Sequence, residues 1–165
     1  MKTVYLVRHA KSSWDYPHLD DRDRPLKGRG IRDAHLMADY VAEQTDVTPT
    51  LYASPATRAL HTAMIFARHF QISLDAVRVQ EELYESTAER VRTLLRGLPQ
   101  NEDAVMIFGH NPTFEEFIDQ CLHQPLGHVP TAAVACLHFP VEAWQDLDFE
   151  AELLFFDFPK NLKAT

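Results

Sequence analysis

The chain has 165 residues, of which 45% are hydrophobic and 24% charged, with only five glycines. This length and composition suit one globular domain over residues 1–165 and exclude collagen-like, low-complexity and largely disordered chains. A net charge of -8 argues against nucleic acid and against an anionic membrane surface as partners.

The charge is unevenly distributed along the chain. Residues 1–32 carry eight basic and four acidic side chains, whereas residues 33–165 carry eight basic and twenty acidic ones. The basic balance near the N-terminus therefore predicts an anionic ligand there.

The cysteines and the N-terminal residues bear on the cellular compartment. Cys121 and Cys136 have apolar neighbours and no C-x-x-C spacing, which predicts buried free thiols rather than a disulfide framework or a zinc site. The first apolar run is too short for a signal peptide, and no stretch reaches about 18 apolar residues. We therefore expect a cytoplasmic protein.

The first half of the chain predicts two strands, each followed by a helix. Residues 3–7 form an apolar run typical of a strand covered on both faces, and residues 50–53 form a shorter strand. Ser54-Pro55 is typical of a helix start, with Ser54 as the cap. Two apolar stripes at helical spacing predict the helices: Ile31, Ala34, Ala38 and Val41, then Leu60, Ala63, Met64 and Ala67.

The second half repeats this alternation. Residues 77–83 predict a brief edge strand, and residues 104–108 predict a buried one. Residues 86–89 resemble a capping box, and Asn111-Pro112 repeats the cap-and-proline signal. Two further stripes predict helices: Val91, Leu94, Leu95 and Leu98, then Phe114, Phe117, Ile118, Cys121 and Leu122.

Residues 132–139 and 153–158 predict two late strands, with a helix as the alternative for each. Strands alternating with helices in this order predict a single three-layer α/β/α domain with an open, mostly parallel central sheet. In such sheets, ligands bind beyond the carboxyl ends of the strands.

Polar clusters follow three of the predicted strands. Arg8 and His9 follow the first strand, residues 54–58 follow the second, and residues 109–111 follow the strand at 104–108. We therefore expect these side chains to share one pocket.

The residue types in these clusters suit a phosphate dianion. Guanidinium groups pair bidentately with phosphate oxygens, and helices beginning near Pro55 and Pro112 would direct backbone N–H groups at the same place. A neutral imidazole can attack phosphorus, while a second, protonated histidine would stabilise transition-state charge. Spacing alone does not assign these two roles.

These segments carry a resemblance to the histidine phosphatase superfamily, which includes the phosphoglycerate mutases. Its signature segments resemble residues 7–10 (Val-Arg-His-Ala), 54–63 and 109–112 (Gly-His-Asn-Pro). Residues 8–14, residues 23–30, Leu83-Tyr84-Glu85 and the short length are similar to the compact SixA-type phosphohistidine phosphatases. The resemblance covers about residues 1–140 and implies a phosphoglycerate mutase-like fold.

The resemblance implies a phosphatase without a cofactor. By motif, His9 would be the nucleophile, Arg8 and Arg58 the phosphate clamp, and His110 the second histidine of the phosphate pocket. Arg8 and His9 would point to opposite faces of a regular strand, so we expect the pleat to end near Val7.

Other residues of the basic N-terminal part are accessory candidates. Lys11 and either Arg22 or Arg24 could assist, with a solvated basic loop as the alternative, and the resemblance does not fix their roles. Many superfamily members have glycine after the nucleophile where this chain has Ala10, as SixA-type members can.

The proton donor of larger superfamily members has no clear match. Glu81, Glu82 and Glu85 are the candidates, and Glu85, directly after Leu83-Tyr84, fits best. Without a dedicated acid, the preferred leaving group is one that departs easily, such as a protonated imidazole. The expected substrate is therefore a phosphohistidine-bearing protein, and we expect the enzyme to be a monomer.

Three alternatives remain open at this point. One is a small-molecule phosphomonoesterase of the same superfamily, and another is a non-catalytic phosphate-binding module that would not need the nucleophile. The third is a metal-dependent phosphoesterase, which the sequence disfavours. Its histidine pair His123-x4-His128 is interrupted by Pro125 and Gly127, and no H-E-x-x-H run is present.

Overall fold

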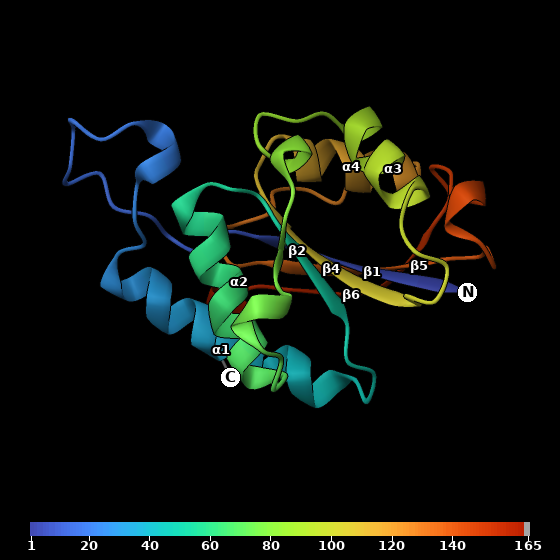
Figure 1. Cartoon of the computed structure of the whole chain (residues 1–165), viewed down its shortest axis with the longest axis horizontal. Coiled ribbons are helices and arrows are strands. Elements are labelled where there is room, and N and C mark those ends of the chain that lie inside the picture. The colour runs from blue at the N-terminus through green and yellow to red at the C-terminus, as the bar shows by residue number, and fades with distance from the viewer. Residues whose placement is uncertain (164–165) are drawn as a thin grey trace.

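The computed structural model describes residues 1–163 and has a six-stranded sheet in the order β3-β2-β4-β1-β5-β6 (Figure 1). The strands are β1 (Lys2–Arg8), β2 (Thr50–Ala53), β3 (Arg78–Val79), β4 (Ala104–Gly109), β5 (Val134–Phe139) and β6 (Glu152–Asp157). The helices are α1 (Gly28–Gln44), α2 (Thr57–His69), α3 (Ala88–Arg96), α4 (Thr113–Leu122) and α5 (Pro159–Lys163).

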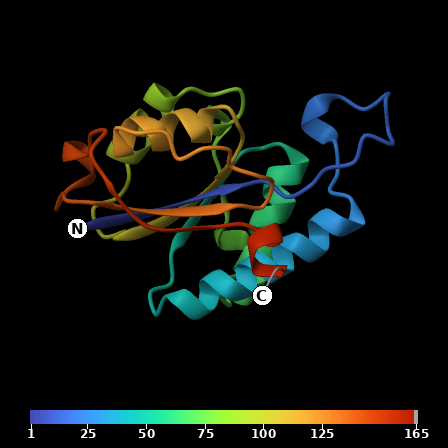
Figure 2. The ribbon, with the colours of Figure 1, turned by 180° about the vertical axis from the view of Figure 1, so that it is seen from behind.

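The sheet is mixed. Neighbouring strands from β3 through β1 run parallel, whereas β5 is antiparallel to β1 and β6 is antiparallel to β5. Helices α1 and α2 lie on one face, and α3 and α4 lie on the other (Figures 1 and 2). The predicted three-layer α/β/α architecture is confirmed, with the two late strands as its antiparallel edge.

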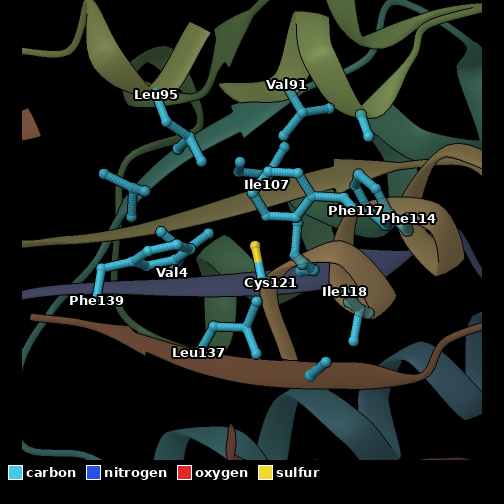
Figure 3. Close-up of a cluster of buried hydrophobic side chains, with 14 of the residues drawn as sticks. Val4, Val91, Leu95, Ile107, Phe114, Phe117, Ile118, Cys121, Leu137 and Phe139 are labelled. Carbon is cyan, nitrogen blue, oxygen red and sulfur yellow. The ribbon is translucent and has the colours of Figure 1, made fainter. Parts of the chain in front are cut away.

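The apolar stripes of α3 and α4 face the sheet. Figure 3 shows their side chains packed against apolar side chains of the sheet. Both cysteines are free and buried, and burial raises the pKa of each thiol to about 12. The residues labelled there come from three elements of this cluster: Val91 and Leu95 from α3; Phe114, Phe117, Ile118 and Cys121 from α4; and Val4, Ile107, Leu137 and Phe139 from the sheet.

Two predicted helix starts need correction. Helix α2 begins at Thr57, because the Ser54 hydroxyl closes a local turn by accepting a 3.2 Å hydrogen bond from the Ala56 N–H. At α3 the cap is Thr87 rather than Ser86, since the Thr87 hydroxyl accepts from the Arg90 N–H at 3.1 Å. Both helices therefore start slightly later than the sequence predicts.

Residues 11–27, called loop 11–27 here, leave the sheet after β1 and return to α1. At its base Ser12 pairs with Leu26, and the Lys27 N–H donates to the Lys11 carbonyl oxygen at 3.0 Å. A Cβ at Gly30 would lie 2.1 Å from that oxygen, so only glycine permits this approach. Every residue from 14 to 23 is exposed, and the loop extends from the body in both views (Figures 1 and 2).

Within residues 1–163, no helix combines the length and apolar character needed to cross a bilayer.

Candidate active site

The strand register brings three carboxyl ends to one edge of the sheet. Arg8 of β1 pairs with Gly109 of β4, and Ala53 of β2 pairs with Phe108. The residues that follow these strands line an open cavity of about 380 Å³. The four predicted site residues all contribute to its wall: Arg8, His9, Arg58 and His110.

The end of β1 explains how adjacent residues face the same cavity. The strand runs through Arg8, one residue past the predicted end of the pleat. The Ala132 N–H lies 3.1 Å from the Arg8 carbonyl oxygen and 3.0 Å from that of His9. Two consecutive carbonyls therefore share one donor, so regular pairing ends here and both side chains reach the cavity.

His9 is held as a neutral imidazole with a defined tautomer. Its side chain is 7% exposed, and its Nδ1 lies 2.8 Å from the Ala10 carbonyl oxygen. A carbonyl only accepts hydrogen bonds, so Nδ1 carries the proton and Nε2 keeps its lone pair. Burial, helped by His110 and the nearby arginines, lowers the pKa of His9 to about 3. A neutral Nε2 is the form that a nucleophile requires.

His110 lies beside His9 with 5.2 Å between ring centres, and its Nε2 is 2.8 Å from the Ser54 hydroxyl oxygen. Burial, together with Arg58 and Arg8, lowers the pKa of His110 to about 4. In the ligand-free site His110 is therefore neutral, and the protonated second histidine stays a prediction for the substrate-bound site. A phosphate dianion beside it would raise that pKa again.

Of the two clamp arginines, Arg58 is buried and Arg8 is half-buried, and both are only partly hydrogen-bonded. Arg8 donates from Nη1 to the Val129 carbonyl oxygen at 2.9 Å. Arg58 donates from Nη1 to the Asp21 carbonyl oxygen at 2.6 Å and from Nη2 to the Asp21 carboxylate at 2.9 Å. The Nε of each lies buried without a hydrogen-bond partner among residues 1–163. Such donors are rare in proteins, and these remain available to an anion.

Asp21 is a cavity residue that the sequence analysis did not single out. Its Oδ2 accepts from Arg58 and, at 2.7 Å, from the Tyr84 hydroxyl. Burial raises the pKa of Asp21, but the hydrogen bonds from Tyr84 and Arg58 outweigh it and hold that pKa below its ordinary value. Asp21 begins a single 3-10 turn (Asp21–Asp23) within loop 11–27, which is too short to give a periodic signal in the sequence, so no spacing could have placed it against α2.

The structure decides between Arg22 and Arg24 as the accessory arginine of the cavity. Arg24 lines the cavity, is 8% exposed, and keeps its buried Nε and Nη1 without hydrogen-bond partners in the described chain. Its guanidinium lies 3.5 Å from the centre of the Trp14 ring, and Nη2 donates to the Ser12 hydroxyl. Arg22 instead pairs with Glu81 outside the cavity lining. Of the two candidates, Arg24 therefore lies in the cavity wall, and Arg22 is excluded from it.

The remaining accessory candidates divide in the same way. Lys11 and Glu85 line the cavity and are exposed, whereas Glu81 and Glu82 do not line it. Glu85 adopts a positive φ of 50°, which an ordinary side chain rarely takes. Among residues 1–163, no hydrogen bond fixes its carboxylate.

The second helix start at the cavity is also later than predicted. Helix α4 begins at Thr113, with Pro112 as its cap residue. The Asn111 side chain instead donates to the Glu115 carboxylate at 2.7 Å and to the Val129 carbonyl oxygen at 2.8 Å. It thereby ties the end of β4 to the same carbonyl that holds Arg8.

Within residues 1–163, no group of three or more histidine, cysteine, aspartate or glutamate side chains could hold a metal ion.

Residues 4–85 match the family model described as the histidine phosphatase superfamily (branch 1). The chain belongs to the histidine phosphatase superfamily. The matched segment contains Arg8, His9 and Arg58 and ends at Glu85, so His110 joins the site from outside it.

Individual relatives span nearly the whole chain. An uncharacterised protein of Mycobacterium leprae is 28% identical over 167 residues, covering 93% of this chain and all of that protein. The crystal structure of a candidate phosphohistidine phosphatase SixA from Agrobacterium tumefaciens is 27% identical, with a TM-score of 0.81 over 96% of this chain and 98% of that one. A mycobacterial glucosyl-3-phosphoglycerate phosphatase shares the fold at 16% identity and a TM-score of 0.68, over 94% and 98% of the two chains.

Proposed function

We propose that this protein hydrolyses phosphohistidine in proteins through a covalent phosphohistidine formed on His9, without a metal ion. The observation that carries the proposal is the state of His9. It is buried and neutral, its Nδ1 proton is held by Ala10, and its Nε2 lone pair shares a cavity with the buried Arg24 and Arg58 and the half-buried Arg8. A non-catalytic phosphate site would not need this tautomer.

The proposed reaction has two displacement steps. His9 Nε2 attacks the phosphorus while the bond from phosphorus to the substrate nitrogen breaks. Arg8 and Arg58, with His110, hold the equatorial oxygens and stabilise the developing charge. Water then attacks the phosphorus of phosphorylated His9, which releases phosphate and restores the imidazole.

The scarcity of acids in the cavity supports phosphohistidine as the substrate. Asp21 is held ionised by its partners, and the Glu85 carboxylate is not fixed by a hydrogen bond among residues 1–163. An alkoxide leaving group needs a positioned proton donor, worth about 10²–10⁴-fold, whereas a protonated imidazole leaves without one. The likeness to the SixA structure from Agrobacterium tumefaciens supports the same substrate class.

A substrate panel tests this assignment. We expect turnover to rank phosphohistidine peptide and phosphoramidate first, aryl phosphates next and alkyl phosphates far behind. Glu85→Gln should change phosphohistidine turnover by less than about threefold, well below the range for a general acid. Efficient hydrolysis of phosphoglycerate that is abolished by Glu85→Gln would contradict the assignment.

That contrary result would favour a small-molecule phosphomonoesterase. The placement of Glu85 in the cavity lining is the observation in favour of this second candidate. Its test is the same glutamate variant, assayed on an alkyl phosphate.

Metal independence has its own experiment. Because the cavity already holds several cationic side chains, we expect full activity in EDTA after dialysis. Strong inactivation that a divalent cation reverses would contradict this.

We also propose that the enzyme acts as a monomer in the cytoplasm, since one chain supplies every proposed catalytic group and its buried thiols suit a reducing compartment.

A further inference from the structure

The cavity contains a carboxylate that a phosphate site alone does not explain. Asp21 shares the wall with Arg8, Arg58 and Arg24, which suit a dianion. An ionised carboxylate in the same cavity repels a phosphate dianion. Its presence therefore suits a substrate that carries positive charge next to its phosphoryl group.

Asp21 is held in a fixed position. One oxygen, Oδ2, takes both hydrogen bonds, from Arg58 on α2 and from Tyr84. The other, Oδ1, has Arg24 Nε at 3.5 Å, which is an ion pair without a hydrogen bond. Asp21 also acts on His110, whose pKa it raises against the lowering by burial and by Arg58 and Arg8. Oδ1 therefore keeps acceptor capacity.

The position of Asp21 fits the leaving-group side of the reaction. His9 lies at the floor of the cavity with 7% exposure, whereas the Asp21 side chain is 54% exposed. In an in-line displacement the leaving group departs from the side of phosphorus opposite the nucleophile. Asp21 lines the same cavity and is far more exposed than His9, so a leaving group that departs from His9 toward solvent can reach it.

We propose that Asp21 binds the protonated imidazole of a phosphohistidine substrate, accepting a hydrogen bond from its distal N–H through Oδ1. This rests on the proposed function and makes Asp21 the residue that selects an imidazolium leaving group. The side chain binds a proton that the substrate already carries and supplies none of its own.

The proton balance of the step is complete. The protonated substrate carries phosphorus on one ring nitrogen and a proton on the other. When His9 Nε2 attacks, the electron pair of the breaking P–N bond returns to the ring, and a neutral imidazole leaves with its distal proton. The Ala10 carbonyl plays the matching part for His9, because it holds the Nδ1 proton while Nε2 gains and loses phosphorus.

The decisive variant is Asp21→Asn. The amide oxygen can still accept from Arg58 and Tyr84, while the charge is lost and an NH₂ group replaces the free acceptor. We expect kcat/KM for a phosphohistidine peptide to fall by about 10- to 100-fold, the scale of a hydrogen bond to a charged group. Turnover of p-nitrophenyl phosphate, whose leaving group has no N–H, should change by less than about threefold. Asp20→Asn and Asp23→Asn are matched controls on the same exposed loop.

Each outcome decides a different question. A loss confined to the phosphohistidine peptide supports the imidazolium site. An equal loss on both substrates would show that Asp21 acts only by positioning Arg58, which overturns the inference and leaves the proposed function standing. A wild-type enzyme that prefers alkyl phosphates would overturn the proposed function itself.

Discussion

Two pairs of histidines in this chain have their ring centres 5.2 Å apart, but their surroundings differ. His9 and His110 lie at strand ends in the cavity, and the Nδ1 of His9 is bound by a backbone carbonyl. His35 on α1 and His69 on α2 lie outside the cavity lining, and their ring nitrogens meet each other at 3.0 Å. In the surface pair, one nitrogen of each ring is occupied by the contact with the other ring, whereas the Nε2 of His9 stays available to a ligand.

The neighbouring charges sharpen this contrast. Buried arginines surround the cavity pair, whereas Asp39 lies 4.0 Å from His69 in the surface pair. Paired imidazoles therefore do not make a phosphate site by themselves. The site follows from where the parallel strands end and from the arginines that meet there.

The largest expected effect separates the two pairs directly. His9→Ala should lower phosphatase activity by more than about 10⁴-fold, because it deletes the nucleophile. His35→Ala should leave activity within about twofold, since its ring lies outside the cavity. Steady-state turnover of a phosphohistidine peptide measures both, and circular dichroism checks that each variant folds. Retained turnover in His9→Ala would contradict the covalent mechanism.

Arg58→Ala is expected to have the next largest effect. Loss of a preorganised charged donor costs about 2–4 kcal/mol of transition-state stabilisation, equivalent to about 30- to 1,000-fold in kcat/KM. Arg68→Ala, at an exposed position of the same helix, is the matched control. A loss below about twofold in Arg58→Ala would place this arginine outside the catalytic machinery.

Two arginines of loop 11–27 form a closer comparison. Arg24→Ala should lower kcat/KM by about 10- to 100-fold, because it removes buried donors without partners from the cavity. Arg22→Ala removes an exposed ion pair with Glu81 and should change kcat/KM by less than about threefold. Measuring kcat/KM of both variants on one phosphohistidine peptide would show whether Arg24 alone contributes to the reaction. Equal effects would mean that Arg24 acts only by supporting the loop.

The smallest expected effect concerns stability. The pKa values of about 3 and about 4 for His9 and His110 lie below the ordinary histidine value. Between pH 7 and pH 5 these two histidines therefore take up protons in the unfolded chain but stay neutral in the folded one. The free energy of unfolding should fall over this range by about 1–2 kcal/mol per histidine. Urea titrations at both pH values should show this loss, and the His9→Gln, His110→Gln double variant should reduce it. His35→Gln should reduce it less, since that ring is exposed. An unchanged pH dependence in the double variant would contradict the account.

Much of the fold follows from local patterns in the sequence. Residues 104–108 are an apolar run with buried neighbours on both faces, so β4 is predicted within one residue of its observed bounds. The same patterns place His9 and His110 at strand ends, because the carboxyl ends of parallel strands share an edge. The helix starts are less predictable, since Ser54 closes a turn before α2 instead of capping it, and Thr87 caps α3 one residue after Ser86.

The part of the site that comes from loop 11–27 could not be predicted. Arg22 lies in a single 3-10 turn and Arg24 ends it, and a turn this short leaves no periodic pattern, so the sequence cannot tell which arginine enters the cavity. The stacking of Arg24 on Trp14 and the contact of Asp21 with Arg58 decide it. Both contacts lie beyond the antiparallel bridge of Ser12 with Leu26 that closes the base of the loop.

The most direct test of the central claim is to trap the phosphoenzyme. Rapid quenching with labelled substrate should give one labelled site in the wild-type protein, at His9 by peptide mapping. The label should be lost in acid and survive alkali, as expected for phosphorus bound to an imidazole nitrogen. His35→Ala should give the same label, and His9→Ala should give none. A label that maps elsewhere, or one lost in alkali and stable in acid, would contradict the account.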